Sequence, residues 1–175
     1  MIRLYHAERL EGVCSQVRDF FDWWSHHGPF PLAVVSGVRA PGAPTREELR
    51  RLGLPAFAPG GQPWRDIQAA LFAAKRTKAA TLAETAHGRC GAADAVPLRL
   101  TATGCPFGTY DCQRDGVSAV ERFERFGELA EANGLAWGGR WKSVFPPFGD
   151  VAHVELPRWQ SLPYPPVAQE ALASV

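Results

Sequence analysis

The chain has 175 residues, a length that suits one compact domain with a tail. Hydrophobic residues make up 46% and charged residues 21%, a balance that argues against a mainly disordered chain. The formal net charge of +1 gives no strong basic field, so the composition indicates neither a nucleic-acid partner nor an anionic membrane. No apolar run approaches the ~20 residues of a membrane span, so we expect no stable membrane insertion.

The first half of the sequence predicts two helices and one strand. Apolar residues at three- and four-residue spacing predict a helix over 6–27, which ends at a Gly-Pro pair. The run FPLAVVS at 30–36 reads as a buried strand. The charged segment at 45–51 fits either a helical turn, capped by Thr45 with Glu48 as its partner, or a solvated surface loop, and we favour the loop. A further helix is predicted over 64–76.

The second half of the sequence predicts mostly loop and short strand over 77–117, followed by another helix. That helix runs from about 118 to 133, with Ser118 as its N-cap and Glu121 completing a capping box. The alternation in VAHVEL predicts a strand over 151–156, and the Pro-rich segment from Pro157 is expected to run extended over the surface. Helices set apart from a few short strands favour an α+β fold.

Four cysteines are too few for a disulfide scaffold: Cys14, Cys90, Cys105 and Cys112. Cys105 and Cys112 lie seven residues apart in a Gly/Pro-rich stretch, where they could pair or remain ordinary thiols, and we favour thiols. Their spacing is not that of a CxxC zinc knuckle.

Two segments carry residues that could bind a metal ion. In the segment 85–94, TAHGRCGAAD, an imidazole (His87) and a carboxylate (Asp94) can reach one ion if the chain turns sharply and enters a strand. In DVAHVE, His153 and Glu155 share one face of the predicted strand, because side chains alternate along a strand. Asp150 lies immediately before the start of that strand. Viewed alone, each group is more often an ordinary surface group.

A third candidate is Arg39, which follows the first predicted strand. Its forked guanidinium could bind a carboxylate or a polarised carbonyl, although a surface role is the more common one for such an arginine.

The order and spacing of these pieces resemble one family. The segments are SGVR at 36–39, QAALFAAKR at 68–76, TAHGRCGAAD at 85–94, GLAWGGRW at 134–141 and DVAHVE at 150–155. Over roughly residues 8–157 they resemble the zinc peptidases that cut bacterial peptidoglycan, namely the D-alanyl-D-alanine carboxypeptidases and the L-alanyl-D-glutamate endopeptidases used as phage endolysins. In the endopeptidase branch the base is the Asp of D-x-x-H, and DVAHVE resembles that pattern.

The resemblance implies a role for each candidate residue. It implies that His87, Asp94 and His153 bind Zn²⁺ and that Asp150 is the general base. Arg39 would steady the scissile carbonyl or a substrate carboxylate. It further implies a small antiparallel sheet flanked by helices, of the Hedgehog/DD-peptidase type, in a zinc peptidase domain over 1–157 with a Pro-rich extended tail over 158–175.

Two tryptophans belong to the same matched segments. Trp137 and Trp141 would support the wall of the site and contact substrate, and core packing is an equal alternative for both.

The sequence departs from the family pattern at three positions. Thr85 replaces Ser and keeps a hydroxyl, Cys90 stands where the family has Gly, and Arg140 reverses the charge of an Asp. If the family Gly needs a positive φ, we expect Cys90 to strain the loop. We also expect Arg140 to place its charge near the site.

The function expected from the resemblance is zinc-dependent hydrolysis of peptidoglycan stem peptides at the L-Ala–D-Glu bond. D-Ala-D-Ala carboxypeptidase action stays open, as does a non-catalytic wall-binding or phage structural module. The N-terminus, MIRLYHAERLEG, has charges where a signal peptide has its apolar core. A cytoplasmic protein that reaches the wall after release, or acts in a host periplasm, is therefore expected. The sequence leaves the oligomeric state open.

Overall fold

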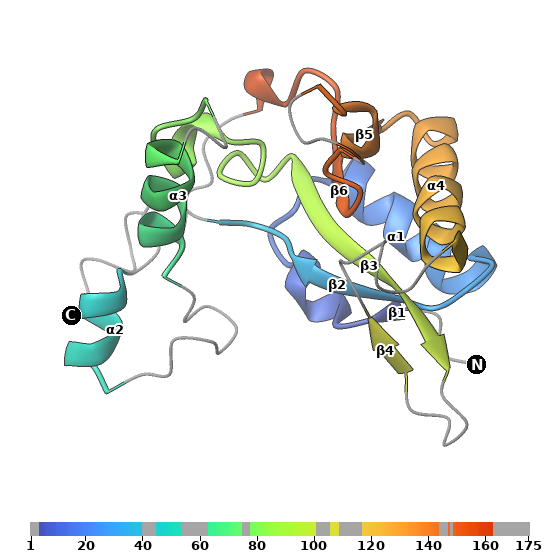
Figure 1. Ribbon diagram of the computed structural model, residues 1–175, viewed down its shortest axis with the longest axis horizontal. Coiled ribbons are helices and arrows are strands. Elements are labelled where there is room, and N and C mark those ends of the chain that lie inside the picture. Colours follow the sequence, from blue (N-terminus) through green and yellow to red (C-terminus); the bar gives the residue numbers. More distant parts are fainter. Residues whose placement is uncertain are drawn as a thin grey trace.

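The computed structural model describes residues 4–39, 45–53, 63–74, 78–100, 106–108, 117–143, 147 and 149–162. The strands are β1 (Leu4–Tyr5), β2 (Leu32–Ser36), β3 (Ala92–Leu100), β4 (Pro106–Gly108), β5 (Ala136–Trp137) and β6 (His153–Glu155). The α-helices are α1 (Ser15–His27), α2 (Arg46–Arg51), α3 (Trp64–Ala73) and α4 (Val117–Ala132). Short 3₁₀ helices are η1 (Ala7–Leu10), η2 (Leu82–Glu84), η3 (Gly138–Arg140) and η4 (Trp159–Ser161). Figure 1 shows this α+β architecture, which confirms the predicted fold class.

One mixed sheet organises the fold. Its strand order is β1-β2-β3-β6-β5, with β4 paired to β3. The pairs are antiparallel, as predicted, except for β1 and β2, which run parallel. The long central strand β3 lies where the sequence indicated mostly loop. The reason is that β3 is buried and rich in alanine, and it contains Pro97, so it shows neither alternation nor strong β propensity.

Helices α1 and α4 pack together against the sheet, as Figure 1 shows. The ring of Phe126 in α4 lies 5.9 Å from that of Phe20 and 5.7 Å from that of Trp24, both in α1. These rings are fully buried, which confirms the predicted apolar face of the first helix. That helix starts at Ser15 rather than at residue 6, because the chain turns at Gly12, whose φ is +76°.

The predicted bounds of α4 agree with the structure to within one residue at each end, and only the predicted N-cap differs. The backbone N–H of Leu135 donates to Ala130 O at 3.0 Å across Gly134, whose φ is +81°. The helix begins at Val117, so Ser118 lies within the first turn and is not its N-cap. Along the helix, Gly127 lies against the indole of Trp137, where a Cβ would come within 2.0 Å of a ring atom.

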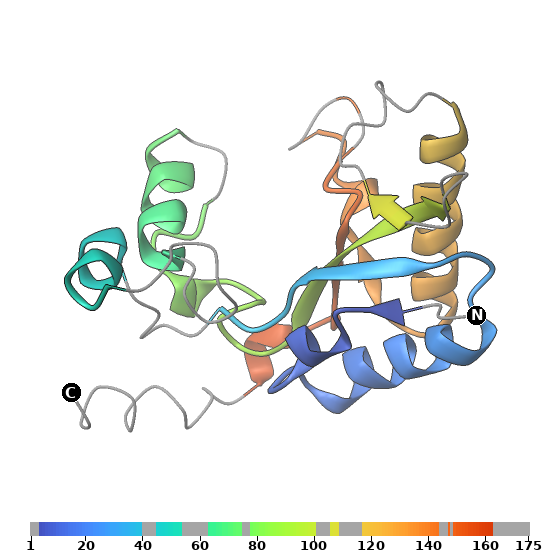
Figure 2. The same ribbon diagram turned by 90° about the horizontal axis from the view of Figure 1, so that it is seen from below.

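The charged segment that could have been a loop forms helix α2. Thr45 caps it through a complete capping box, with Glu48 N donating to Thr45 Oγ1 at 3.2 Å and Thr45 N donating to Glu48 Oε2 at 2.7 Å. The favoured reading of a surface loop is therefore wrong, because both partners of the cap are present. Figures 1 and 2 show α2 and α3 beyond the end of β2, away from the layer of α1 and α4.

After β6 the chain folds back on the loop before β3. The N–H of Leu156 donates to Gly91 O at 2.7 Å, and Arg89 Nη1 donates to Leu162 O at 3.1 Å. The stretch around η4 is therefore packed rather than extended, and residues 163–175 lie outside the described part, as do Cys105 and Cys112. In the described ranges no helix is both long and apolar enough to cross a bilayer.

Candidate metal centre

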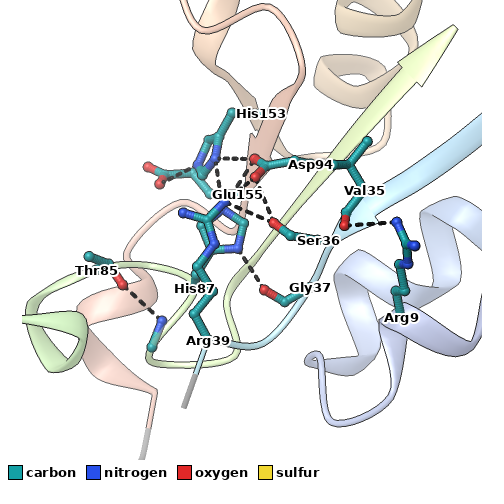
Figure 3. Close-up of polar contacts among 11 residues, drawn as sticks. Arg9, Val35, Ser36, Gly37, Arg39, Thr85, His87, Asp94, His153 and Glu155 are labelled. Atoms are coloured by element: carbon teal, nitrogen blue, oxygen red, sulfur yellow. Dashed lines mark hydrogen bonds and ion pairs between the residues drawn. The ribbon is translucent and has the colours of Figure 1, made fainter. Parts of the chain in front are cut away.

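The register of three strands brings the first functional side chains together. In the sheet, β3 lies between β2 and β6, with Asp94 opposite Ser36 on one side and opposite His153 on the other. Residues directly opposite on paired strands project from the same face, so these three side chains meet where β2 ends and β6 begins, as Figure 3 shows. All three are buried.

His87 reaches the same point from the loop that precedes β3. Thr85 shapes this loop, since its hydroxyl donates to Leu82 O at 2.7 Å and accepts from Gly88 N at 2.9 Å. The change from Ser to Thr therefore keeps a hydroxyl that has a structural use. Cys90 has a φ of +61°, so it occupies the left-handed conformation that favours glycine, as expected if a glycine at this position needs a positive φ.

The three predicted ligands converge. His87 Nε2 lies 3.1 Å from Asp94 Oδ1 and 3.2 Å from His153 Nδ1, and His153 Nδ1 lies 3.0 Å from Asp94 Oδ1. Bonds of about 2.0–2.1 Å place two ligands of a tetrahedral zinc site about 3.3 Å apart. The spacing of these atoms therefore fits one small divalent cation.

Hydrogen bonds at the far side of each imidazole fix which nitrogen faces the cluster. His87 Nδ1 lies 2.7 Å from the carbonyl oxygen of Gly37, and His153 Nε2 lies 3.1 Å from Glu155 Oε2. Since a carbonyl and a carboxylate only accept, these nitrogens carry the protons in the neutral rings. His87 Nε2 and His153 Nδ1 then direct lone pairs at Asp94 Oδ1, an arrangement of three acceptors that a cation stabilises.

The second oxygen of Asp94 is held from β2 and from the segment that follows it. Ser36 Oγ donates to Asp94 Oδ2 at 2.7 Å, and Arg39 Nη2 donates to both Asp94 Oδ2 and Ser36 Oγ. The guanidinium of Arg39 lies 4.5 Å from the ring centre of Trp64 at the start of α3. Arg39 Nε is buried and has no hydrogen-bond partner. The structure thus places Arg39 against a predicted ligand and leaves its buried Nε–H without a partner.

Charges within the cluster shift its titration in opposite directions. Burial raises the pKa of Asp94, but His87 and Arg39 outweigh it and hold that pKa well below its usual range. Burial lowers the pKa of His87. For His153 the hydrogen bonds to Asp94 and Glu155 outweigh burial and raise the pKa to about 10. The cluster therefore has a strong electrostatic preference for positive charge around an ionised carboxylate.

Asp150 lies at the entrance to β6, beside the ligands. Its N–H donates to Gly138 O at 2.9 Å, and its carbonyl accepts from His153 N at 3.1 Å. A Cβ on Gly138 would come within 2.4 Å of Asp150 O and 3.0 Å of its Cβ, so only glycine allows η3 to approach so closely. Burial and then the charge of Asp94 raise the pKa of Asp150. The structure brings this carboxyl near the cluster without placing it among the three ligand atoms.

The two predicted wall tryptophans lie in different environments. The ring of Trp141 lies 5.2 Å from that of His153, next to the cluster. Trp137 is part of the buried core, and its Nε1 donates to Val151 O at 2.9 Å, which supports the packing alternative for this residue. Arg140 does not project its charge freely, since it donates to both carboxylate oxygens of Glu131 in α4, at 2.9 and 2.7 Å.

Three residues with a place in the site had no assigned role in the sequence analysis. They are Ser36, which donates to Asp94; Glu155, which accepts from His153; and Trp64, which stacks on Arg39. The alternation of strand residues put Glu155 on the face of His153, so its role had a signal. Ser36 opens the matched segment SGVR at 36–39, which marked its position but not its contact with Asp94. Trp64 meets Arg39 across a long stretch of chain, and the sequence gives no signal for that contact.

Comparison with known proteins gives a likeness in structure but none in sequence. No protein-family model matches the sequence, and no curated protein matches it. Among solved structures, the chain is similar to the L-Ala D-Glu endopeptidase ChiX of Serratia marcescens, with a TM-score of 0.49 and 14% identity. The match covers 86% of this chain and 84% of that chain. This identity is too low to assign shared residues or a shared activity.

Proposed function

We propose that the chain is a zinc-dependent peptidase that hydrolyses peptidoglycan stem peptides, with the L-Ala–D-Glu bond as its target. The observation that carries the proposal is the convergence of one atom each from His87, Asp94 and His153, all within 4.8 Å of one another, beside the half-buried carboxyl of Asp150. Three protein ligands with a neighbouring base are typical of catalytic rather than structural zinc. The substrate class rests on the resemblance of the sequence motifs.

In this proposal each residue has a defined task. A divalent cation held by the three ligands supplies Lewis-acid chemistry toward the scissile carbonyl and toward water. Asp150 takes the proton of the attacking water and later passes it to the leaving amine. Arg39 fixes Asp94 through Nη2 and would steady a substrate carboxylate or a carbonyl oxygen that gains charge. Trp141 contributes an apolar wall beside His153.

The decisive experiment combines metal analysis of the purified protein with digestion of muropeptides followed by mass spectrometry. We expect one zinc per chain and products cut between L-Ala and D-Glu. Release of terminal D-Ala alone would select the carboxypeptidase alternative. Binding of stem peptide without any product would indicate a wall-binding module, and absence of metal binding would refute the proposal.

Two variants separate the ligands from the base. His153→Ala should lose zinc and activity together, whereas Asp150→Ala should keep zinc and lose turnover by roughly 10²–10⁴-fold, the usual contribution of a general base. His6→Ala and Asp19→Ala, which change exposed residues, are the matched controls. Full turnover in Asp150→Ala would contradict the assigned base.

A further inference from the structure

Two cysteines that are far apart in the sequence lie next to each other in the fold. Cys14 immediately precedes α1, and Cys90 belongs to the loop between His87 and Asp94. The backbone N–H of Cys14 donates to the carbonyl oxygen of Cys90 at 2.7 Å. Standard backbone geometry then limits the separation of their Cα atoms to at most about 6.6 Å. Disulfides span Cα separations of about 4.4–6.8 Å, so the Cα atoms of Cys14 and Cys90 are close enough for a disulfide.

The side chains of this pair are also available for reaction. Both thiols are free, and both residues are partly buried, so neither is sealed in the core. Burial, and then the neighbouring Cys14, raise the pKa of Cys90, in keeping with the short backbone contact between the two residues.

The backbone at Cys90 holds its side chain in a fixed direction. Its φ of +61° is a left-handed conformation that residues other than glycine rarely adopt. Two hydrogen bonds keep the loop in this shape: Cys90 N donates to His87 O at 3.2 Å, and Gly91 N donates to Ala86 O at 2.8 Å. A residue other than glycine carries a conformational cost at this position. The cysteine side chain, unlike other side chains, can form a covalent bond with the neighbouring Cys14.

We propose that Cys14 and Cys90 form a disulfide under oxidising conditions and thereby tie the start of α1 to the loop that bears His87. The oxidant is a low-molecular-weight disulfide. One cysteine thiolate attacks it to form a mixed disulfide and release one thiolate, and the second cysteine thiolate then displaces the other. Two cysteine thiols are oxidised, the small disulfide is reduced to two thiols, and the two protons of the cysteines pass to the released thiolates.

The crosslink changes the stability of a defined part of the molecule. It joins the ends of the segment 14–90, which contains α1, β2, α2, α3 and the loop that bears His87. Closing a loop of this length restricts the unfolded chain, so oxidation should raise the unfolding temperature by about 5–10 °C. Hydrogen exchange of the amides in residues 86–91 should slow in the oxidised form, because opening of the loop then requires movement of α1.

The test uses the full chain, equilibrated in buffers with increasing ratios of oxidised to reduced glutathione. Free thiols are blocked with N-ethylmaleimide, and the protein is digested with trypsin without reduction. Cleavage after arginine puts Cys14 in peptide 10–18 and Cys90 in peptide 90–99, whereas Cys105 and Cys112 share peptide 100–114. The expected product is a crosslink between peptides 10–18 and 90–99, which no other pairing gives.

Variants and alternative outcomes make the test decisive. Cys14→Ser should lose the crosslink and the rise in unfolding temperature, while Cys105→Ser should keep both. Comparison of oxidised and reduced wild-type protein gives the same readout if Cys14→Ser does not fold. The proposal is overturned if both cysteines stay fully modifiable in the native protein under oxidised glutathione, or if either pairs with Cys105 or Cys112. A crosslink that changes neither unfolding temperature nor amide exchange overturns the proposed effect on the loop.

Discussion

The hydroxyl of Ser36 provides a direct test of how the fold positions the proposed metal ligand Asp94. Ser36 Oγ donates to Asp94 Oδ2 at 2.7 Å, on the side of the carboxylate that faces away from His87 and His153. Ser36→Ala removes this donor without changing the charge of the site. A hydrogen bond to a charged group contributes about 1.5–3 kcal/mol, which corresponds to a loss of roughly 10–100-fold in metal affinity if the bond serves to orient the ligand. Loss of an outer partner of a metal ligand typically has an effect of that size.

The assay is competition for Zn²⁺ or Co²⁺ against a chromophoric chelator, with wild-type protein and Ser36→Ala at the same pH. Ser25→Ala is the matched control, since Ser25 donates to Asp22 O within α1 and lies in no part of the cluster. We expect the control to bind metal as the wild type does. Unchanged affinity in Ser36→Ala, within about twofold, would refute the idea that β2 positions Asp94 through this hydroxyl.

Three further predictions concern other parts of the fold. Gly127→Ala should lower the free energy of unfolding in urea by about 1–3 kcal/mol, despite the better helix propensity of alanine, because the new Cβ would lie 2.0–2.4 Å from the indole of Trp137; a more stable variant would contradict this. Glu155→Gln should retain more metal affinity than Glu155→Ala, since an amide oxygen can still accept from His153 Nε2; equal losses in the two variants would argue against that acceptor role. Hydrogen bonds, first from the backbone at the start of α2, lower the pKa of Glu48 from 4.5 to about 2. The ionised Glu48 therefore stabilises the fold fully above pH 4.5, and this stabilisation is lost as the pH falls towards 2. The free energies of unfolding of Glu48→Gln and of the wild type should therefore converge across this pH range.

Local patterns in the sequence are sufficient to predict the helices and strands that bury one face. The spacing of Phe20, Phe21 and Trp24 predicted α1, and the alternation around His153 predicted β6. The length of β3 escaped prediction because the strand is buried and alanine-rich, so its sequence indicated only loop and short strand. Its position, between β2 and β6, is a property of the whole sheet rather than of its own residues.

The same distinction explains which parts of the site were predictable. The spacing of His87 and Asp94 and the alternation through His153 are local, and the three atoms do converge. The role of Arg39 was anticipated only as a contact to substrate, because its actual partner lies 55 residues away and meets it through the pairing of β2 with β3. A register of that kind depends on every strand in the sheet, so no short segment encodes it.

Arg140 shows how a single substitution can be misread from the sequence. A change of charge sign beside a metal site suggests an altered field at the ligands, yet the guanidinium turns to α4 and pairs with both oxygens of Glu131. It lies 5.3 Å from the ring centre of Trp137. An exposed ion pair of this kind contributes little to stability, and its two charges largely cancel at a distance. The charge of Arg140 is therefore balanced by Glu131 of α4 rather than directed at His153.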